Sequence, residues 1–151
     1  MKRTALALTA LAVCGLSLLI WQLLHEELAV TAQGITVTET VDTAWVEAVQ
    51  DGAFSGMIYQ TDSGGAAQTV TYTVRLRNPG LLPADMVEIQ LVSAAGDIAA
   101  YQEPAAVSIP AGGDGTLSLR LLTGPGAVYR RDLVITYYLW GSLHTIHYTI
   151  S

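Results

Sequence analysis

The stretch VRLRNPGLLPADMVEIQL, residues 74–91, decides the fold. Apolar and polar residues alternate up to Arg77, and the alternation resumes after Pro83. Between the two runs lie Asn-Pro-Gly and a second proline, and a proline has no N–H to donate to a β-ladder. The stretch therefore predicts two half-buried strands that are joined by a crossing between the two sheets of an immunoglobulin-like sandwich.

The same period of two recurs along most of the chain after residue 33, and turn signals separate the runs at intervals of roughly 8–12 residues. Residues 43–52 fit either a continued strand or a helical turn. The pattern favours an all-β fold, an antiparallel sandwich of about seven to nine strands over residues 34–151. The further strand candidates are 34–41, 53–60, 69–77, 107–109, 116–122, 132–140 and 143–151, with a turn and a short edge strand within 94–102.

The last two runs flank Gly141-Ser142, a pair that is typical of a two-residue hairpin loop. If these two residues form the loop, Leu133 lies opposite Ile150 and Leu139 lies opposite His144. This side of the hairpin is apolar, so we expect it to face the core.

The reverse side of this hairpin carries Tyr138, Trp140, Leu143 and His147. Much of that side is polar and suits solvent, but the first three residues gather at the turn end. An apolar cluster on a solvent-facing side is either covered by a loop or available to a partner. These four residues, the hairpin patch, are the predicted site of partner contact.

The N-terminal part of the chain has a different character, because residues 4–24 contain no charge. As a helix this segment spans about 31 Å, the thickness of the hydrocarbon core of a bilayer. Two basic residues precede it and two glutamates follow it, which favours a cytoplasmic N-terminus. We expect a cytoplasmic stretch at 1–3, a transmembrane signal-anchor helix at 4–24, a linker at 25–33 and an extracytoplasmic domain beyond, in a single-pass protein of the cell membrane.

Two other interpretations of the N-terminal segment stay open. Val30-Thr31-Ala32 is an acceptable cleavage site, so the domain could be secreted after cleavage near Ala32, although the apolar run exceeds the roughly 7–15 residues of a signal peptide. A lipoprotein signal would place its lipid on Cys14, but Val13 stands where such a signal needs a small residue. Both alternatives would release or re-anchor the same domain.

Composition excludes several classes of protein. Cys14 is the only cysteine, so no intrachain disulfide can form. The formal net charge is −6 and Lys2 is the only lysine, so the basic footprint of a nucleic-acid-binding protein is absent. Asn78 is the only asparagine, and Pro79 after it excludes N-glycosylation there.

Residues that could carry chemistry are few and scattered. Asp62-Ser63-Gly64 matches the aspartic-protease triplet, but polar residues precede it and favour a loop tip instead. His144 and His147 lie three apart on a strand and therefore face opposite ways, so they cannot chelate one ion. Asp62, Asp97 and Asp114 lie in separate turns, where solvated carboxylates or a composite calcium site are both open. We predict no catalytic, cofactor-binding or metal-binding residues.

The order of features in TYTVRLRNPGLLPADMVEIQLVSAAGDIA, VSIPAGGDGTLSLRL and LVITYYL resembles the bacterial adhesion-related immunoglobulin-like domains known as CARDB, and more loosely the NEW3 and water-stress (WHy) domains. The shared pattern is a strand that ends in Asn with a small turn residue, an I-P-A-G turn and a strand of leucines. In this family Gly usually follows the Asn closely, whereas Pro79 intervenes here. The resemblance implies an accessory extracellular module without catalytic residues.

These observations together predict a membrane-anchored, extracytoplasmic module that is not an enzyme. It would contact lipid through its N-terminal helix, and would bind or scaffold a protein or a cell-surface polymer. The alternative is a structural subunit of a surface or envelope assembly such as a pilus, secretion or stator-like complex, joined through the helix and an unpaired strand edge. Archaeal stator proteins also look like one anchor plus a sandwich. A hydrolase built on the Asp62 loop is a third, weaker hypothesis.

Overall fold

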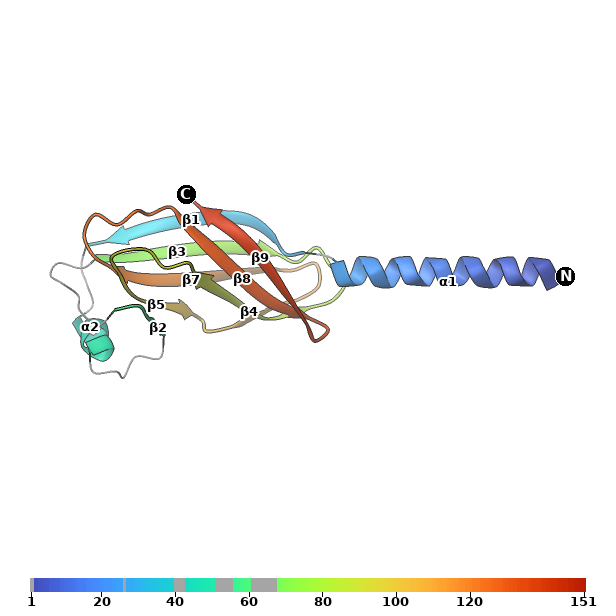
Figure 1. Ribbon diagram of the computed structural model, residues 1–151, viewed down its shortest axis with the longest axis horizontal. Coiled ribbons are helices and arrows are strands. Elements are labelled where there is room, and N and C mark those ends of the chain that lie inside the picture. The colour runs from blue at the N-terminus through green and yellow to red at the C-terminus, as the bar shows by residue number, and fades with distance from the viewer. Residues whose placement is uncertain (1, 26, 40–42, 51–55, 61–67) are drawn as a thin grey trace.

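A computed structural model describes residues 2–25, 27–39, 43–50, 56–60 and 68–151 of the chain. Most of the described chain is antiparallel strand, as the sequence predicts, and two helices occur in the N-terminal third (Figure 1). The elements follow in the order α1 (Lys2–His25), β1 (Ala29–Thr38), α2 (Thr43–Gln50), β2 (Met57–Ile58), β3 (Gln68–Arg77), β4 (Ala84–Leu91), β5 (Asp97–Glu103), β6 (Val107–Ile109), β7 (Asp114–Thr123), β8 (Arg131–Leu139) and β9 (Ser142–Ile150).

The strands form two sheets that enclose one main core. The first sheet has the order β1-β3-β7-β5-β2 and the second the order β6-β4-β8-β9. Both sheets turn their apolar side toward the other, because alternate residues of a strand point to opposite faces. The side chains fully enclosed between them include Val70, Tyr72, Val74, Leu76, Val87, Leu117, Leu119, Leu121, Leu133, Ile135 and Tyr137.

The crossing predicted from residues 74–91 is confirmed. Strand β3 belongs to the five-stranded sheet and β4 to the four-stranded sheet, so residues 78–83 carry the chain from one layer to the other. Asn78 is buried in this crossing. Its side-chain Nδ2 donates to the carbonyls of Leu82 (2.8 Å) and Ile109 (3.1 Å), and its Oδ1 accepts from the N–H of Gly80 (3.0 Å). One amide side chain thus ties together the crossing and strand β6.

The linker is shorter than the sequence predicts. Strand β1 begins at Ala29, inside the range 25–33 expected to be a linker, and Ala29 lies opposite Arg77 of β3. Leu28 before it is already buried. Most side chains of β1 are exposed, so their polarity does not determine where the strand begins. The backbone of β1 pairs with β3 from Ala29 onward, and the alternation in the sequence therefore does not mark the start of the strand.

Residues 43–50 form a helix, which resolves the ambiguous segment. In α2, Trp45 and Val49 lie four apart and therefore share one face. That face packs on Ile98 and Leu122, on the outer side of the five-stranded sheet, and forms a second small core. Of the strand expected at 53–60, only β2 is strand, and residues 53–55 lie outside the described residues.

The predicted register of the last hairpin is wrong by two residues. Leu133 lies opposite Tyr148, and Leu139 lies opposite Ser142. The loop is Trp140-Gly141, with φ values of 47° and 80°, the left-handed pair that a type I′ turn requires. A shift of two keeps every side chain on its predicted face, so Leu133 and Leu139 are still buried.

Helix α1 extends away from the two sheets as a single rod (Figure 1). Its large apolar side chains are exposed over the part whose side chains are described, from Leu6 at 75% to Trp21 at 60%. Among the described residues, no helix is both long enough and apolar enough to cross a membrane.

Candidate functional site

The hairpin patch lies on the outer face of the four-stranded sheet. Tyr138 of β8 lies directly opposite Leu143 of β9, and Trp140 follows in the turn. Their exposed fractions are 39%, 59% and 81%, so no described residue covers them. His147 lies opposite Val134, four residue pairs farther from the turn. The structure therefore groups Tyr138, Trp140 and Leu143, and leaves His147 on the same face but apart from them.

The two histidines of the hairpin face opposite sides, as the sequence predicts. His144 lies opposite Tyr137 and stacks on its ring, with 5.4 Å between ring centroids and 20° between the ring planes. His147 is exposed on the other side. His144 is therefore part of the rim of the core and His147 part of the outer surface.

Tyr137 also connects β8 to the start of the domain. The backbone N–H of Leu28 donates to the Tyr137 hydroxyl at 3.3 Å. Burial raises the pKa of Tyr137, the Leu28 hydrogen bond lowers it, and the charge of Glu27 raises it further. The hydroxyl therefore stays protonated and holds the segment that follows α1 against β8.

The outer face of the five-stranded sheet carries an open hollow of about 370 Å³ beside α2. Arg120 lies over the Tyr101 ring at 5.8 Å and pairs with Glu103 at 3.4 Å, while Trp45 meets the same ring edge-on at 5.0 Å. Hydroxyl groups dominate the rest of the lining. The hollow offers hydrogen bonds to a polar group, and none of its described lining residues carries a carboxylate or an imidazole for acid–base chemistry. It is lined by Thr38, Trp45, Thr69, Thr71, Tyr101, Ser118 and Arg120.

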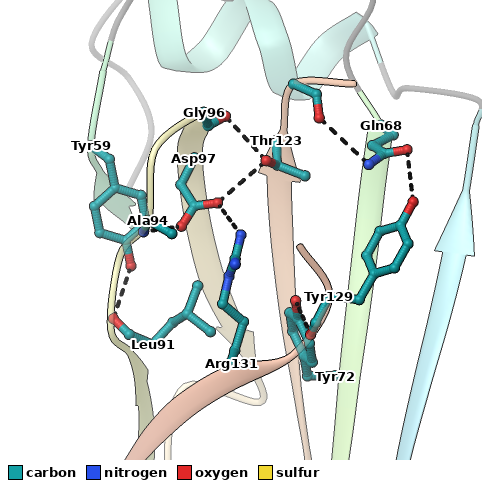
Figure 2. Close-up of polar contacts among 11 residues, drawn as sticks. Tyr59, Gln68, Tyr72, Leu91, Ala94, Gly96, Asp97, Thr123, Tyr129 and Arg131 are labelled. Atoms are coloured by element: carbon teal, nitrogen blue, oxygen red, sulfur yellow. Dashed lines mark hydrogen bonds and ion pairs between the residues drawn. The ribbon is translucent and has the colours of Figure 1, made fainter. Parts of the chain in front are cut away.

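A buried ion pair, drawn in Figure 2, lies at the end of the sheets away from α1. Arg131 Nη2 is 2.9 Å from Asp97 Oδ1, and the two side chains are 5% and 0% exposed. Asp97 also accepts from Thr123 Oγ1 at 3.3 Å and from the N–H of Ala94 at 2.7 Å. The expectation of Asp97 as a solvated turn residue is therefore wrong, because its carboxylate turns inward to a cation from the other sheet.

Tyr72 packs beside this ion pair and donates its hydroxyl to the carbonyl of Tyr129 at 3.1 Å. Burial raises the pKa of Tyr72 from 10.0 to about 12; Arg131 lowers it, and Asp97 and Tyr129 raise it. Tyr59, whose hydroxyl points to the carbonyl of Leu91, has a pKa raised by burial and then by Asp97. Both hydroxyl groups are therefore neutral and donate hydrogen bonds to backbone carbonyls within the fold.

The Tyr72 pKa predicts a loss of stability in alkali. A folded-state pKa above the unfolded value favours the protonated form, so the contribution of Tyr72 is full below pH 10.0 and is lost as the pH rises to about 12. We expect the free energy of unfolding to fall over this window, and Tyr72→Phe to make the fall shallower. Denaturant titrations at several pH values measure both slopes. Equal slopes in the two proteins would contradict the assignment.

The described residues contain no group of three or more His, Cys, Asp or Glu that could hold a metal ion. Asp97 is used in the ion pair, and Asp114 pairs with Arg75 at 3.3 Å near the surface. Asp62-Ser63-Gly64 lies outside the described residues, so its role stays a prediction. Sequence reasoning missed the Asp97–Arg131 pair, whose partners lie 34 positions apart and belong to different sheets.

No family model matches the chain. A search of curated proteins likewise returned no match.

Proposed function

We propose that this protein is a membrane-anchored, extracytoplasmic binding module with an immunoglobulin-like sandwich of the CARDB type, and that it is not an enzyme. Helix α1 would hold it in the membrane, and the hairpin patch would contact a protein partner. The observation that carries the proposal is the exposed cluster of Tyr138, Trp140 and Leu143 on an otherwise polar outer face.

The anchor is supported by the chemistry of α1. The helix runs for 24 residues, and positions 4–24 carry no charge. A helix that exposes large apolar side chains all round is stabilised by an apolar environment around it. The two sheets supply none of it, because large side chains such as Leu6, Leu11 and Trp21 stay exposed. A bilayer would surround all of these side chains with apolar lipid.

The binding role is supported by the cost of leaving apolar side chains in water. Tyr138 and Leu143 form a cross-strand pair whose apolar area faces outward. Aromatic residues of this kind commonly supply the centre of a protein interface. A sugar polymer is the other ligand class that stacks on exposed aromatic rings, and it would appear in the same experiment as material without a protein band.

The test compares two tyrosines of equal exposure. Tyr138 and Tyr129 are both 39% exposed, but Tyr129 precedes β8 and Tyr138 lies near its end. In affinity purification from solubilised membranes, Tyr138→Ala should lower recovery of the partner about tenfold, which corresponds to about 1.4 kcal/mol. Tyr129→Ala should leave it unchanged. An equal recovery with both variants would remove the hairpin patch as the contact.

A structural subunit is the second candidate, because β1 and β9 each form an edge of their sheet. An edge strand offers free backbone groups for pairing with another chain. Cross-linking in intact membranes separates the candidates. A subunit would give one complex of fixed stoichiometry that survives Tyr138→Ala, whereas a binding module would give a complex that this substitution abolishes.

A further inference from the structure

Five of the exposed apolar side chains of the two-sheet domain lie at one end of it. They come from two separate parts of the chain, the crossing with the start of β4 and the last hairpin. We refer to them as the proximal cluster. Its members and their exposed fractions are Trp140 (81%), Leu81 (71%), Leu143 (59%), Met86 (57%) and Tyr138 (39%).

This end is the one from which α1 leaves. Strand β1, which follows α1, starts at Ala29 opposite Arg77, the last residue of β3 before the crossing. Strand β8 ends at Leu139 opposite Ala84, the first residue of β4. The crossing, the start of β4 and the β8–β9 turn therefore all lie beside the exit of α1 (Figure 1).

The stability of the fold does not explain why a tryptophan occupies position 140 in the turn. Its φ of 47° is a left-handed conformation, which costs a bulky residue about 1 kcal/mol or more. The first position of a type I′ turn is normally Asn or Gly. With 81% of its surface exposed, the indole gains nothing from the core. The turn would be at least as stable with Asn, so the indole needs another explanation.

We propose that Trp140, together with Leu81 and Met86, rests in the interface of the membrane that holds α1, with the indole inserted among the lipid headgroups. Tryptophan favours this zone because its ring is apolar and its N–H is polar, and leucine side chains add buried area. The net charge of −6 gives no attraction to anionic lipid. The contact is therefore apolar and is made with zwitterionic phosphatidylcholine. This inference rests on the proposed anchoring of α1. It gives the indole of the turn to the lipid, and leaves the Tyr138–Leu143 pair on the sheet face as the contact for the protein partner.

The three tryptophans of the chain allow a test with the full-length protein. Trp21 lies in α1, Trp45 is buried in α2 at the opposite end of the domain, and Trp140 lies in the turn. The protein is placed in phosphatidylcholine vesicles with and without lipid brominated near the headgroup, which quenches nearby indoles. The variants are Trp21→Phe, Trp140→Asn and the two combined. Trp140→Asn creates the Asn-Gly pair that suits the turn, so the hairpin is retained.

We expect bromolipid to quench the Trp21→Phe protein, through Trp140, and to leave the doubly substituted protein unquenched. The Trp140→Asn protein should also be quenched, through Trp21, which reports the anchor. Quenching of Trp140→Asn without quenching of Trp21→Phe would overturn the interface contact and leave the anchor in place. Absence of quenching in Trp140→Asn would instead overturn the proposed anchoring. Quenching of Trp21→Phe alone would keep the contact and reject the anchor.

Discussion

Asn78→Ala should lower the free energy of unfolding by about 3 kcal/mol, because it leaves two backbone groups of the crossing and one of β6 without their partner. These groups are the carbonyls of Leu82 and Ile109 and the N–H of Gly80. The contacts to Ile109 and Gly80 are buried, so water cannot replace them without opening the crossing. Denaturant unfolding of the detergent-solubilised protein, followed by tryptophan fluorescence, measures the loss.

Two further substitutions test the reason for this loss. Asn78→Asp keeps the size of the side chain but turns a carboxylate oxygen toward two carbonyl oxygens, so it should be at least as destabilising at pH 7. Gln68→Ala removes another amide, whose Nε2 is 3.5 Å from the carbonyl of Gly124 in a half-buried site. Its effect should stay within about 0.5 kcal/mol. A loss of under about 1 kcal/mol for both Asn78 variants would refute this role of the amide.

Breaking the Asp97–Arg131 pair should have an effect of the same order or larger. Removal of one partner leaves the other charge buried and unpaired, which typically costs about 3–5 kcal/mol. Arg131→Met would leave the carboxylate of Asp97 without its cation, and Asp97→Asn would leave a guanidinium that is only 5% exposed without its anion. Each single substitution should therefore shift the unfolding midpoint strongly.

The double substitution distinguishes a buried pair from two unrelated losses. Arg131 Nε has no hydrogen-bond partner among the described residues, so the pair recovers only part of its desolvation cost. The loss in free energy of unfolding in the double variant, Asp97→Asn with Arg131→Met, should therefore be smaller than the sum of the two single losses by about 2 kcal/mol or more. The exposed pair of Arg75 and Asp114 is the control, and Asp114→Asn should cost under about 1 kcal/mol. Additive losses at positions 97 and 131 would show that the charges are not coupled.

The period of two predicted the layers well because burial in a sheet follows side-chain alternation directly. Leu133 and Leu139 were placed on the core side from spacing alone, and both are buried. The crossing was predicted because two prolines cannot donate to a ladder. Register was harder to predict, since Trp140 takes a left-handed conformation that its residue type does not favour.

The rest depended on contacts that no local pattern contains. The eight residues of α2 are compatible with either periodicity, and the outer face of the sheet selects helix by burying Trp45 and Val49. Asp97 belongs with Arg131 only because β5 and β8 start at the same end of opposing sheets. For the candidate site, the exposed hairpin residues were predicted from their face, whereas Leu81 joins them only through the position of the crossing in space.

The course of β1 has a mechanical consequence. This strand leads from α1 and runs along the long axis of the molecule (Figure 1). It forms nine residue pairs with β3, with one register shift between Val30 and Ala32. Hydrogen bonds in an antiparallel ladder lie perpendicular to the strands. Tension applied through α1 would therefore load these bonds in shear, all together, and would not peel them apart one by one. A domain tethered in this way resists force best in the direction in which its tether would transmit it.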